Sequence, residues 1–163
     1  MIIALLFSIL IVTVFISAMV YSFGIQENIS TYFYCLEEWH IDAGVLFFWF
    51  AVLSAFLAIP FWLEVSTENT QFLAFLACAG LVFVGAASRF KVDLTGKVHY
   101  TAAIICISSS ILWLICSGLW IVPLFIFAGL GWVSYKKGNL MFWGELAGFI
   151  SIYIGLIVKA IWN

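Results

Sequence analysis

IIALLFSILIVTVFISAMVYSF, residues 2–23, is an apolar run without a single charged residue. A helix of about 20 such residues crosses the hydrocarbon core of a bilayer. The run is too long for the apolar core of a signal peptide, and it has neither a basic segment before it nor a clear small-residue cleavage signal. We therefore expect a first membrane span that is retained in the protein.

The composition of the whole chain extends this expectation. Apolar and aromatic residues make up 66% of the sequence and charged residues 9%, whereas soluble domains carry about 25% charged residues. Such a chain cannot cover itself with a water-compatible surface, so a bilayer must solvate its exterior. The net charge of -2 argues against nucleic acid as a partner.

The apolar runs predict an all-α, polytopic transmembrane bundle that forms one domain over residues 1–163. Chain length allows six or seven spans at about 20 residues each. Small residues in the third run favour a helix packed closely inside the bundle. We expect six spans, about 2–23, 43–63, 71–88, 98–117, 119–135 and 140–162.

The first link, residues 24–42, is predicted to contain a short amphipathic helix. Ser30 is a candidate N-cap for a helix that runs to Trp39. Its apolar face is expected to lie on the membrane surface or over the mouth of the bundle. That face would be formed by Tyr32, Phe33, Leu36 and Trp39.

The longest polar interruption in the second half of the chain is residues 86–103, and it helps to decide the orientation. In a six-span protein, links 24–42, 89–97 and 136–139 share one side of the membrane. Five of the six basic residues belong to these links and only Lys159 to the other side. The excess of basic residues predicts that these links face the cytoplasm. The five residues are Arg89, Lys91, Lys97, Lys136 and Lys137.

Glu145 falls about one and a half turns into the last span. A carboxylate at that depth is costly unless it is paired, protonated or facing water, so it is a candidate functional residue. The alternative is a position near the headgroups, with a hydrogen bond to a neighbouring helix. Hydroxyls at mid-depth, Ser108–Ser110, are expected to bond back to carbonyls of their own helix, with a polar lining as the alternative.

A second group of candidates lies around the polar links. His99, Asp93, His40 and Glu38 would form an acid–base cluster if the first and third links meet. A structural role for His99, bonded to Asp93 or to a carbonyl, is the simpler interpretation. No His or Cys spacing matches a metal signature, so we expect neither a metal nor another cofactor.

Two further features predict partners. Arg89, Lys91 and Lys97 are expected to anchor the chain at the interface or to bind anionic lipid headgroups. A stripe of small residues in the last span favours helix packing, either within the chain or in a homo-oligomer. The stripe consists of Gly144, Gly148, Ser151 and Gly155.

The run Phe90–Asp93, followed by Val98–Tyr100 and the small residues after it, resembles a motif of the DRAM/Sfk-type family of small six-span membrane proteins. The Ile29–Thr31 stretch is loosely similar to the first-link motif of that family. The sequence departs from the pattern at Thr101–Ala102, where the family has Gly-Ala, and a Pro-Glu expected in the first link is missing. The overall pattern also resembles small bacterial membrane proteins, such as those of Bacteroidetes.

The resemblance implies a six-helix bundle with the first and third links packed together, and a part in lipid organisation or lipid-anchor remodelling. It also implies that these links lie outside the cytoplasm, which conflicts with the charge count. Three functions stay open. The protein binds or organises lipid without a defined catalytic site, or it is an intramembrane enzyme that modifies lipid through His99, Asp93 and carboxylates of the first link. The third possibility is a small transporter or channel that uses Glu145.

Overall fold

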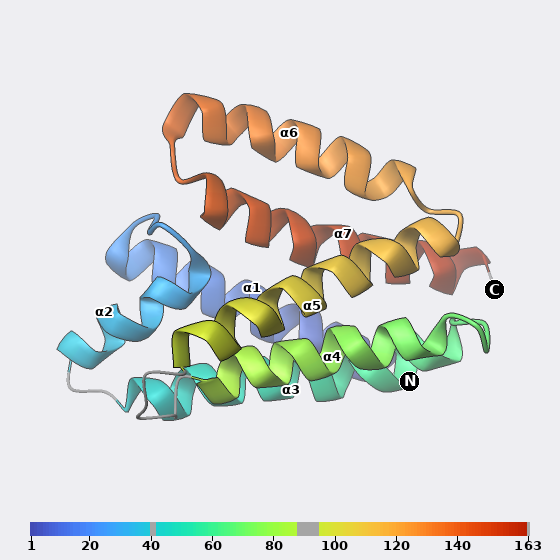
Figure 1. Cartoon of the computed structure of the whole chain (residues 1–163), viewed down its shortest axis with the longest axis horizontal. Coiled ribbons are helices and arrows are strands. Elements are labelled where there is room, and N and C mark those ends of the chain that lie inside the picture. The colour runs from blue at the N-terminus through green and yellow to red at the C-terminus, as the bar shows by residue number, and fades with distance from the viewer. Residues whose placement is uncertain (40–41, 88–94, 163) are drawn as a thin grey trace.

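The computed structural model describes residues 1–39, 42–87 and 95–162. These residues form a bundle of α-helices whose long members are nearly aligned (Figure 1). His40, Ile41, Ser88–Leu94 and Asn163 lie outside the described residues. In chain order the elements are α1 (Ile2–Phe23), the 3-10 helix η1 (Ile29–Thr31), α2 (Tyr32–Glu38), α3 (Ala43–Glu64), α4 (Gln71–Ala87), α5 (Thr95–Cys116), α6 (Ile121–Lys137) and α7 (Leu140–Trp162).

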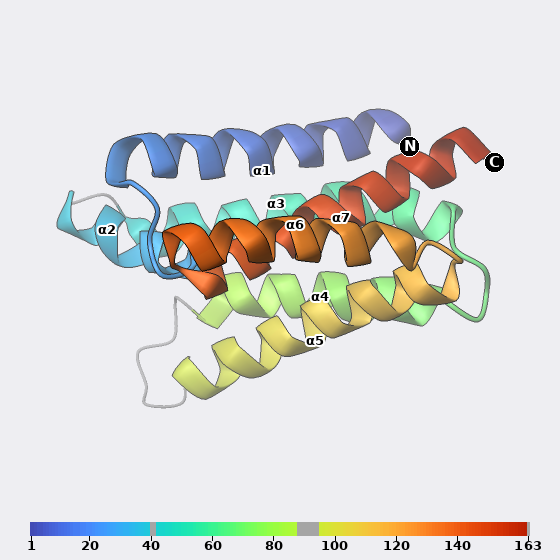
Figure 2. The ribbon, with the colours of Figure 1, turned by 90° about the horizontal axis from the view of Figure 1, so that it is seen from above.

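The helices pack in a defined order around the bundle axis. α4 lies along both α3 and α5, α1 lies along α3, and α6 packs mainly against α7. Two views at right angles show that α2 sits at the end of the bundle where α3, α5 and α7 begin (Figures 1 and 2). The first link therefore covers one end of the helices that enclose the interior.

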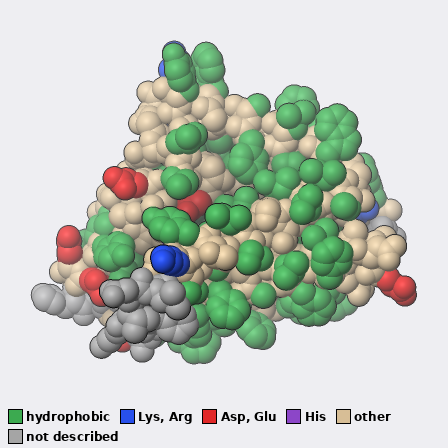
Figure 3. All heavy atoms as spheres, in the orientation of Figure 1, with side chains coloured by type: hydrophobic (Ala, Val, Ile, Leu, Met, Phe, Trp, Pro, Cys, Tyr) green, Lys and Arg blue, Asp and Glu red, His purple; other side chains and the backbone are tan. Residues whose placement is uncertain are grey.

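Four helices are long and apolar enough to cross a bilayer, over Ile2–Phe23, Gly44–Glu64, Gly96–Cys116 and Leu140–Trp162 of the described chain. α4 is a shorter apolar helix. Hydrophobic side chains are spread over much of the visible face in Figure 3. Large side chains such as Phe56, Phe125 and Ile161 are more than half exposed, as expected for a surface in contact with lipid. The predicted all-helical class is confirmed, and four helices could cross a membrane. The number of six spans stays a prediction.

Several helix ends differ from those predicted. α5 begins at Thr95, inside the stretch assigned to the third link. The three residues before Val98 therefore belong to the helix and not to the link. Lys136 and Lys137 form the last turn of α6 rather than a link, where their charges face the negative end of the helix dipole. Between α5 and α6, Gly118 has φ +78°, a left-handed conformation that allows the tight turn between these two helices.

The first link differs from prediction at both ends of its helix. Ser30 does not cap α2. Asn28 caps the 3-10 helix η1 that leads into α2, because its side-chain oxygen accepts from the Thr31 backbone N–H at 2.8 Å. The helix ends at Glu38, so Trp39 leaves the inward face and is 57% exposed. Tyr32 and Leu36 are buried as expected. They place α2 over the bundle, where the Tyr32 ring lies edge-on to Phe142 of α7.

Small residues bring α4 close to both of its neighbours, as the sequence predicts. A Cβ built on Gly80 would lie 2.8 Å from the Ala102 carbonyl oxygen of α5. A Cβ on Gly85 would lie 2.6 Å from the Ala51 Cβ of α3. In α7, a Cβ on Gly155 would overlap the Leu114 side chain of α5. The expected packing within the chain is therefore confirmed for Gly155, while a homo-oligomer stays a prediction.

Candidate functional site: a central cavity

A cavity of about 100 Å³ lies between α3, α4, α5 and α7, with η1 at one end. It forms where small side chains from different helices face one another and leave the space between them unfilled. α3 contributes a row of alanines at helical spacing. The alanine and glycine residues of the wall are Ala51, Ala55, Ala58, Ala77, Ala103 and Gly148.

The cavity is elongated along the bundle. Its wall on α3 extends from Phe47 to Trp62, which is about 22 Å at 1.5 Å per residue. On α7 the wall extends from Glu145 to Leu156. Most of the remaining wall is apolar and comes from aliphatic and aromatic side chains. These include Phe50, Leu81, Val84, Ile107, Phe149 and Ile152.

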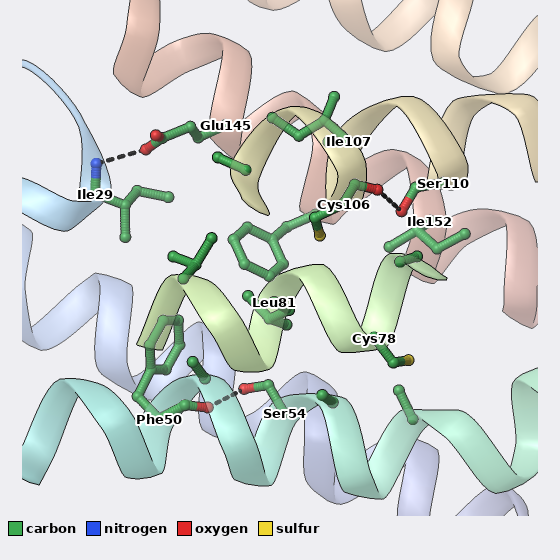
Figure 4. Close-up of a pocket in the computed structure, with 18 of the residues that line it drawn as sticks. Ile29, Phe50, Ser54, Cys78, Leu81, Cys106, Ile107, Ser110, Glu145 and Ile152 are labelled. Atoms are coloured by element: carbon green, nitrogen blue, oxygen red, sulfur yellow. Dashed lines mark hydrogen bonds between the residues drawn. The ribbon is translucent and has the colours of Figure 1, made fainter. Parts of the chain in front are cut away.

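Polar groups gather at the end of the cavity nearest the first link. His99, near the start of α5, and Glu145, near the start of α7, both line the wall there and are partly buried. The Glu145 carboxylate accepts a hydrogen bond from the Ile29 backbone N–H at 2.6 Å (Figure 4). Figure 4 shows this pair at one end of the cavity and Cys78 and Ser110 at the other. The polar end of the cavity, as we use the term below, is therefore the end that holds Glu145 and His99, the two titratable acid and base groups of its wall.

The first link is held against the start of α7 by hydrogen bonds in addition to the Glu145 bond. The Asn139 side-chain amide donates to the Ile25 carbonyl at 3.1 Å. The Phe142 backbone N–H, which has no partner within the first turn of α7, donates to the Glu27 carbonyl at 2.9 Å. The first link and the start of α7 therefore lie on the same side of the bundle, as the alternation of spans predicts.

A smaller polar cluster lies at mid-depth. The Tyr153 hydroxyl and the Ser8 hydroxyl are 2.7 Å apart, and Ser8 also donates to the Ser54 carbonyl at 2.7 Å. Ser54 in turn donates to the Phe50 carbonyl of its own helix at 2.6 Å. These bonds satisfy buried hydroxyls and tie α1, α3 and α7 together. Farther along, Trp62 lines the wall, is 4% exposed, and has an indole N–H without a partner among the described residues.

Two of the three mid-depth serines of α5 bond back to their own helix, as the sequence predicts. Ser108 donates to the Ile104 carbonyl at 2.6 Å and Ser110 to the Cys106 carbonyl at 2.8 Å. Ser110 also lines the cavity. Ser110 therefore fits both interpretations, a bond to its own helix and a polar lining, because a hydroxyl bonded to its own helix can still border a cavity.

The predicted acid–base cluster is described only in part. His99 lies in the cavity wall, whereas Glu38 is exposed and is not part of that wall. Asp93 and His40 lie outside the described residues. The structure instead brings His99 and Glu145 to the same end of one cavity, a pairing that the sequence analysis missed. The sequence indicated this proximity only through position, because both residues lie near the starts of helices that begin at the same end of the bundle.

The predicted headgroup residues are also described only in part. Lys97 is exposed and borders a groove between α4 and α5, beside Phe83 and Ile105, that is separate from the central cavity. Arg89 and Lys91 lie outside the described residues. Binding of an anionic headgroup by these three residues stays a prediction.

Burial favours the neutral form of two side chains in the first link. Burial raises the pKa of the Tyr32 hydroxyl, which donates to the Gly24 carbonyl at 2.8 Å. Burial also raises the pKa of the Cys35 thiol, with a further contribution from the Glu38 charge. Cys35, Cys78, Cys106 and Cys116 are all free thiols. The described residues contain no group of three or more His, Cys, Asp or Glu that could hold a metal ion.

The described geometry therefore centres on one cavity with His99 and Glu145 at its polar end. The resemblance to the DRAM/Sfk-type family depends partly on Phe90–Asp93, which lie outside the described residues. Membership of that family stays a prediction. Compared with family models, curated proteins and solved structures, the chain matches none.

Proposed function

We propose that this integral membrane protein binds a membrane lipid, with one chain of the lipid inside the central cavity. The observation that supports the proposal is the shape and polarity of the cavity. Its apolar wall is about 22 Å long at 1.5 Å per helical residue, and the hydrocarbon core of one leaflet is about 15 Å thick. One acyl chain fits this length, and the polar end beside Glu145 would receive the headgroup.

We further propose that α4 and α6 also cross the bilayer, which gives six spans. Each has 17 residues, or about 25 Å at 1.5 Å per residue, and a bilayer accommodates such short spans by local thinning. The first link would face the cytoplasm of a bacterial inner membrane, because five of the six basic residues belong to its side.

A pair of glycine substitutions on α7 tests lipid binding. Gly148 lines the cavity, and a Cβ built on it meets only the Ile107 side chain, at 4.0 Å. Gly148→Leu should therefore fill the cavity with little strain. Gly144 lies one turn earlier, outside the cavity wall, and a Cβ there meets nothing within 4 Å. Gly144→Leu is the matched control, because it adds the same side chain to the same helix.

Native mass spectrometry of the protein extracted from its membrane measures the bound lipid. We expect the unmodified protein and Gly144→Leu to retain one lipid and Gly148→Leu to lose it in at least about nine molecules of ten, since filling the site removes most of the buried apolar contact. Circular dichroism would establish that both variants are folded. Equal lipid occupancy in all three proteins would contradict the proposal.

A further inference from the structure

The cavity has an unusual charge balance for a lipid site. Glu145 is the one Asp or Glu in its wall, and the wall includes no Lys or Arg among the residues that the structure describes. Lys97, the nearest described basic residue in sequence to His99, borders a different groove. An anionic headgroup at the polar end would therefore be repelled by the Glu145 carboxylate, and no Lys or Arg of the described wall would offset that repulsion.

The hydrogen bonding of Glu145 leaves capacity for a ligand. One carboxylate oxygen, Oε2, accepts from the Ile29 N–H. A carboxylate has about four acceptor positions on its two oxygens, and no cationic side chain of the described residues pairs with this one. Burying a carboxylate is costly unless it is paired and hydrogen-bonded. A ligand group with a positive charge and several N–H donors would both pair with the carboxylate and fill its remaining acceptor positions.

The position of Glu145 fits the entry of such a group. The carboxylate lies at the polar end of the cavity with Ile29 (Figure 4). His99, in the wall at the same end, offers an imidazole that can accept or donate a hydrogen bond. From there the apolar wall continues along α3 to Trp62. A headgroup held at Glu145 would therefore place its chain along the cavity.

We propose, building on the lipid-binding function above, that the cavity selects an amphipath whose headgroup is a protonated amine. The ammonium donates to the Glu145 carboxylate, and the alkyl chain lies between α3, α4, α5 and α7. Long-chain amines and aminolipids share this chemistry. Fatty acids have the same chain with the opposite charge and are disfavoured by the same carboxylate.

Three probes with the same alkyl chain test this selection: hexadecylamine, hexadecanol and hexadecanoic acid. Their binding to the purified full chain in micelles of a neutral maltoside at pH 7 would be measured by scintillation proximity with radiolabelled probes. We expect the amine to bind at least about tenfold more tightly than the alcohol and the acid, because a hydrogen bond to a charged group adds that much.

Two substitutions assign the preference to Glu145. Glu145→Gln removes the charge and keeps an oxygen that can accept from the Ile29 N–H, so we expect the amine to bind within about twofold of the alcohol. Unchanged binding of the alcohol would show that this variant is folded. Glu64→Gln is the matched control, because Glu64 is exposed at the end of α3 and outside the cavity wall, and it should keep the full preference for the amine.

The outcomes separate the two proposals. Similar binding of all three probes that Gly148→Leu abolishes would overturn amine selection and leave lipid binding in place. Tighter binding of the acid than of the amine would overturn amine selection in the same way. If Gly148→Leu changes the binding of none of the probes, the cavity is not their site, and both proposals are wrong.

Discussion

Trp113→Ala should lower the free energy of unfolding by about 3–5 kcal/mol, the usual cost of truncating a buried tryptophan. Trp113 is the largest fully buried side chain of the described chain. Its indole N–H donates to the Ser66 hydroxyl at 2.7 Å, and its ring lies edge-on to Trp62 at 5.5 Å. Alanine would leave a void and remove both interactions.

Unfolding by SDS in mixed micelles, followed by circular dichroism, would measure this loss. Trp162→Ala is the matched control, because Trp162 is 71% exposed in the last turn of α7. Exposed substitutions usually change stability by less than about 0.5 kcal/mol. Equal losses for the two variants would show that Trp113 is not in the packed interior.

Gly80→Ala should be the most damaging substitution of a glycine by alanine, at a cost of about 1–3 kcal/mol or more, because overpacking forces packed elements apart. The new Cβ would lie 2.8 Å from the Ala102 carbonyl oxygen and 2.8 Å from the Cys106 backbone nitrogen. Backbone atoms cannot rotate away as a side chain can. α4 and α5, which pack closely along their lengths, would have to separate.

Gly129→Ala is the control for this effect, because a Cβ on Gly129 of α6 meets nothing within 4 Å. Alanine is favoured over glycine within a helix by roughly 0.5–1 kcal/mol, so this variant should be as stable as the unmodified protein or more so. Thermal unfolding of both variants in the same detergent would measure the difference. A fall in the melting temperature for Gly129→Ala that equals the fall for Gly80→Ala would contradict the close contact between α4 and α5.

The contrast among glycines shows how far sequence reasoning reaches in this chain. The sequence predicts that small residues face other helices, and Gly80 and Gly155 do so. Gly148 belongs to the same stripe as Gly155, yet it borders the cavity, and Gly144 has open space around it. A small residue brings helices together or leaves a void according to the side chains opposite it, and those come from distant parts of the chain.

For the candidate site, too, the sequence identifies the notable residues but not the groups that surround them. Glu145 and His99 stand out in the sequence because a carboxylate and an imidazole are uncommon within apolar runs. The partner of Glu145 is the backbone N–H of Ile29, and a backbone group carries no sequence signature. The alanine row of α3 at Ala51, Ala55 and Ala58 is visible in the sequence, but its position beside Gly148 follows only from the packing.

The most direct test of a lipid-binding cavity is a structure determined in nanodiscs made from the native membrane lipids. We expect continuous density for one alkyl chain beside Gly148 and along α3, with the headgroup next to Glu145. A collapsed cavity in which the α7 wall packs directly against Ala51 and Ala55, with no density between the helices, would contradict it.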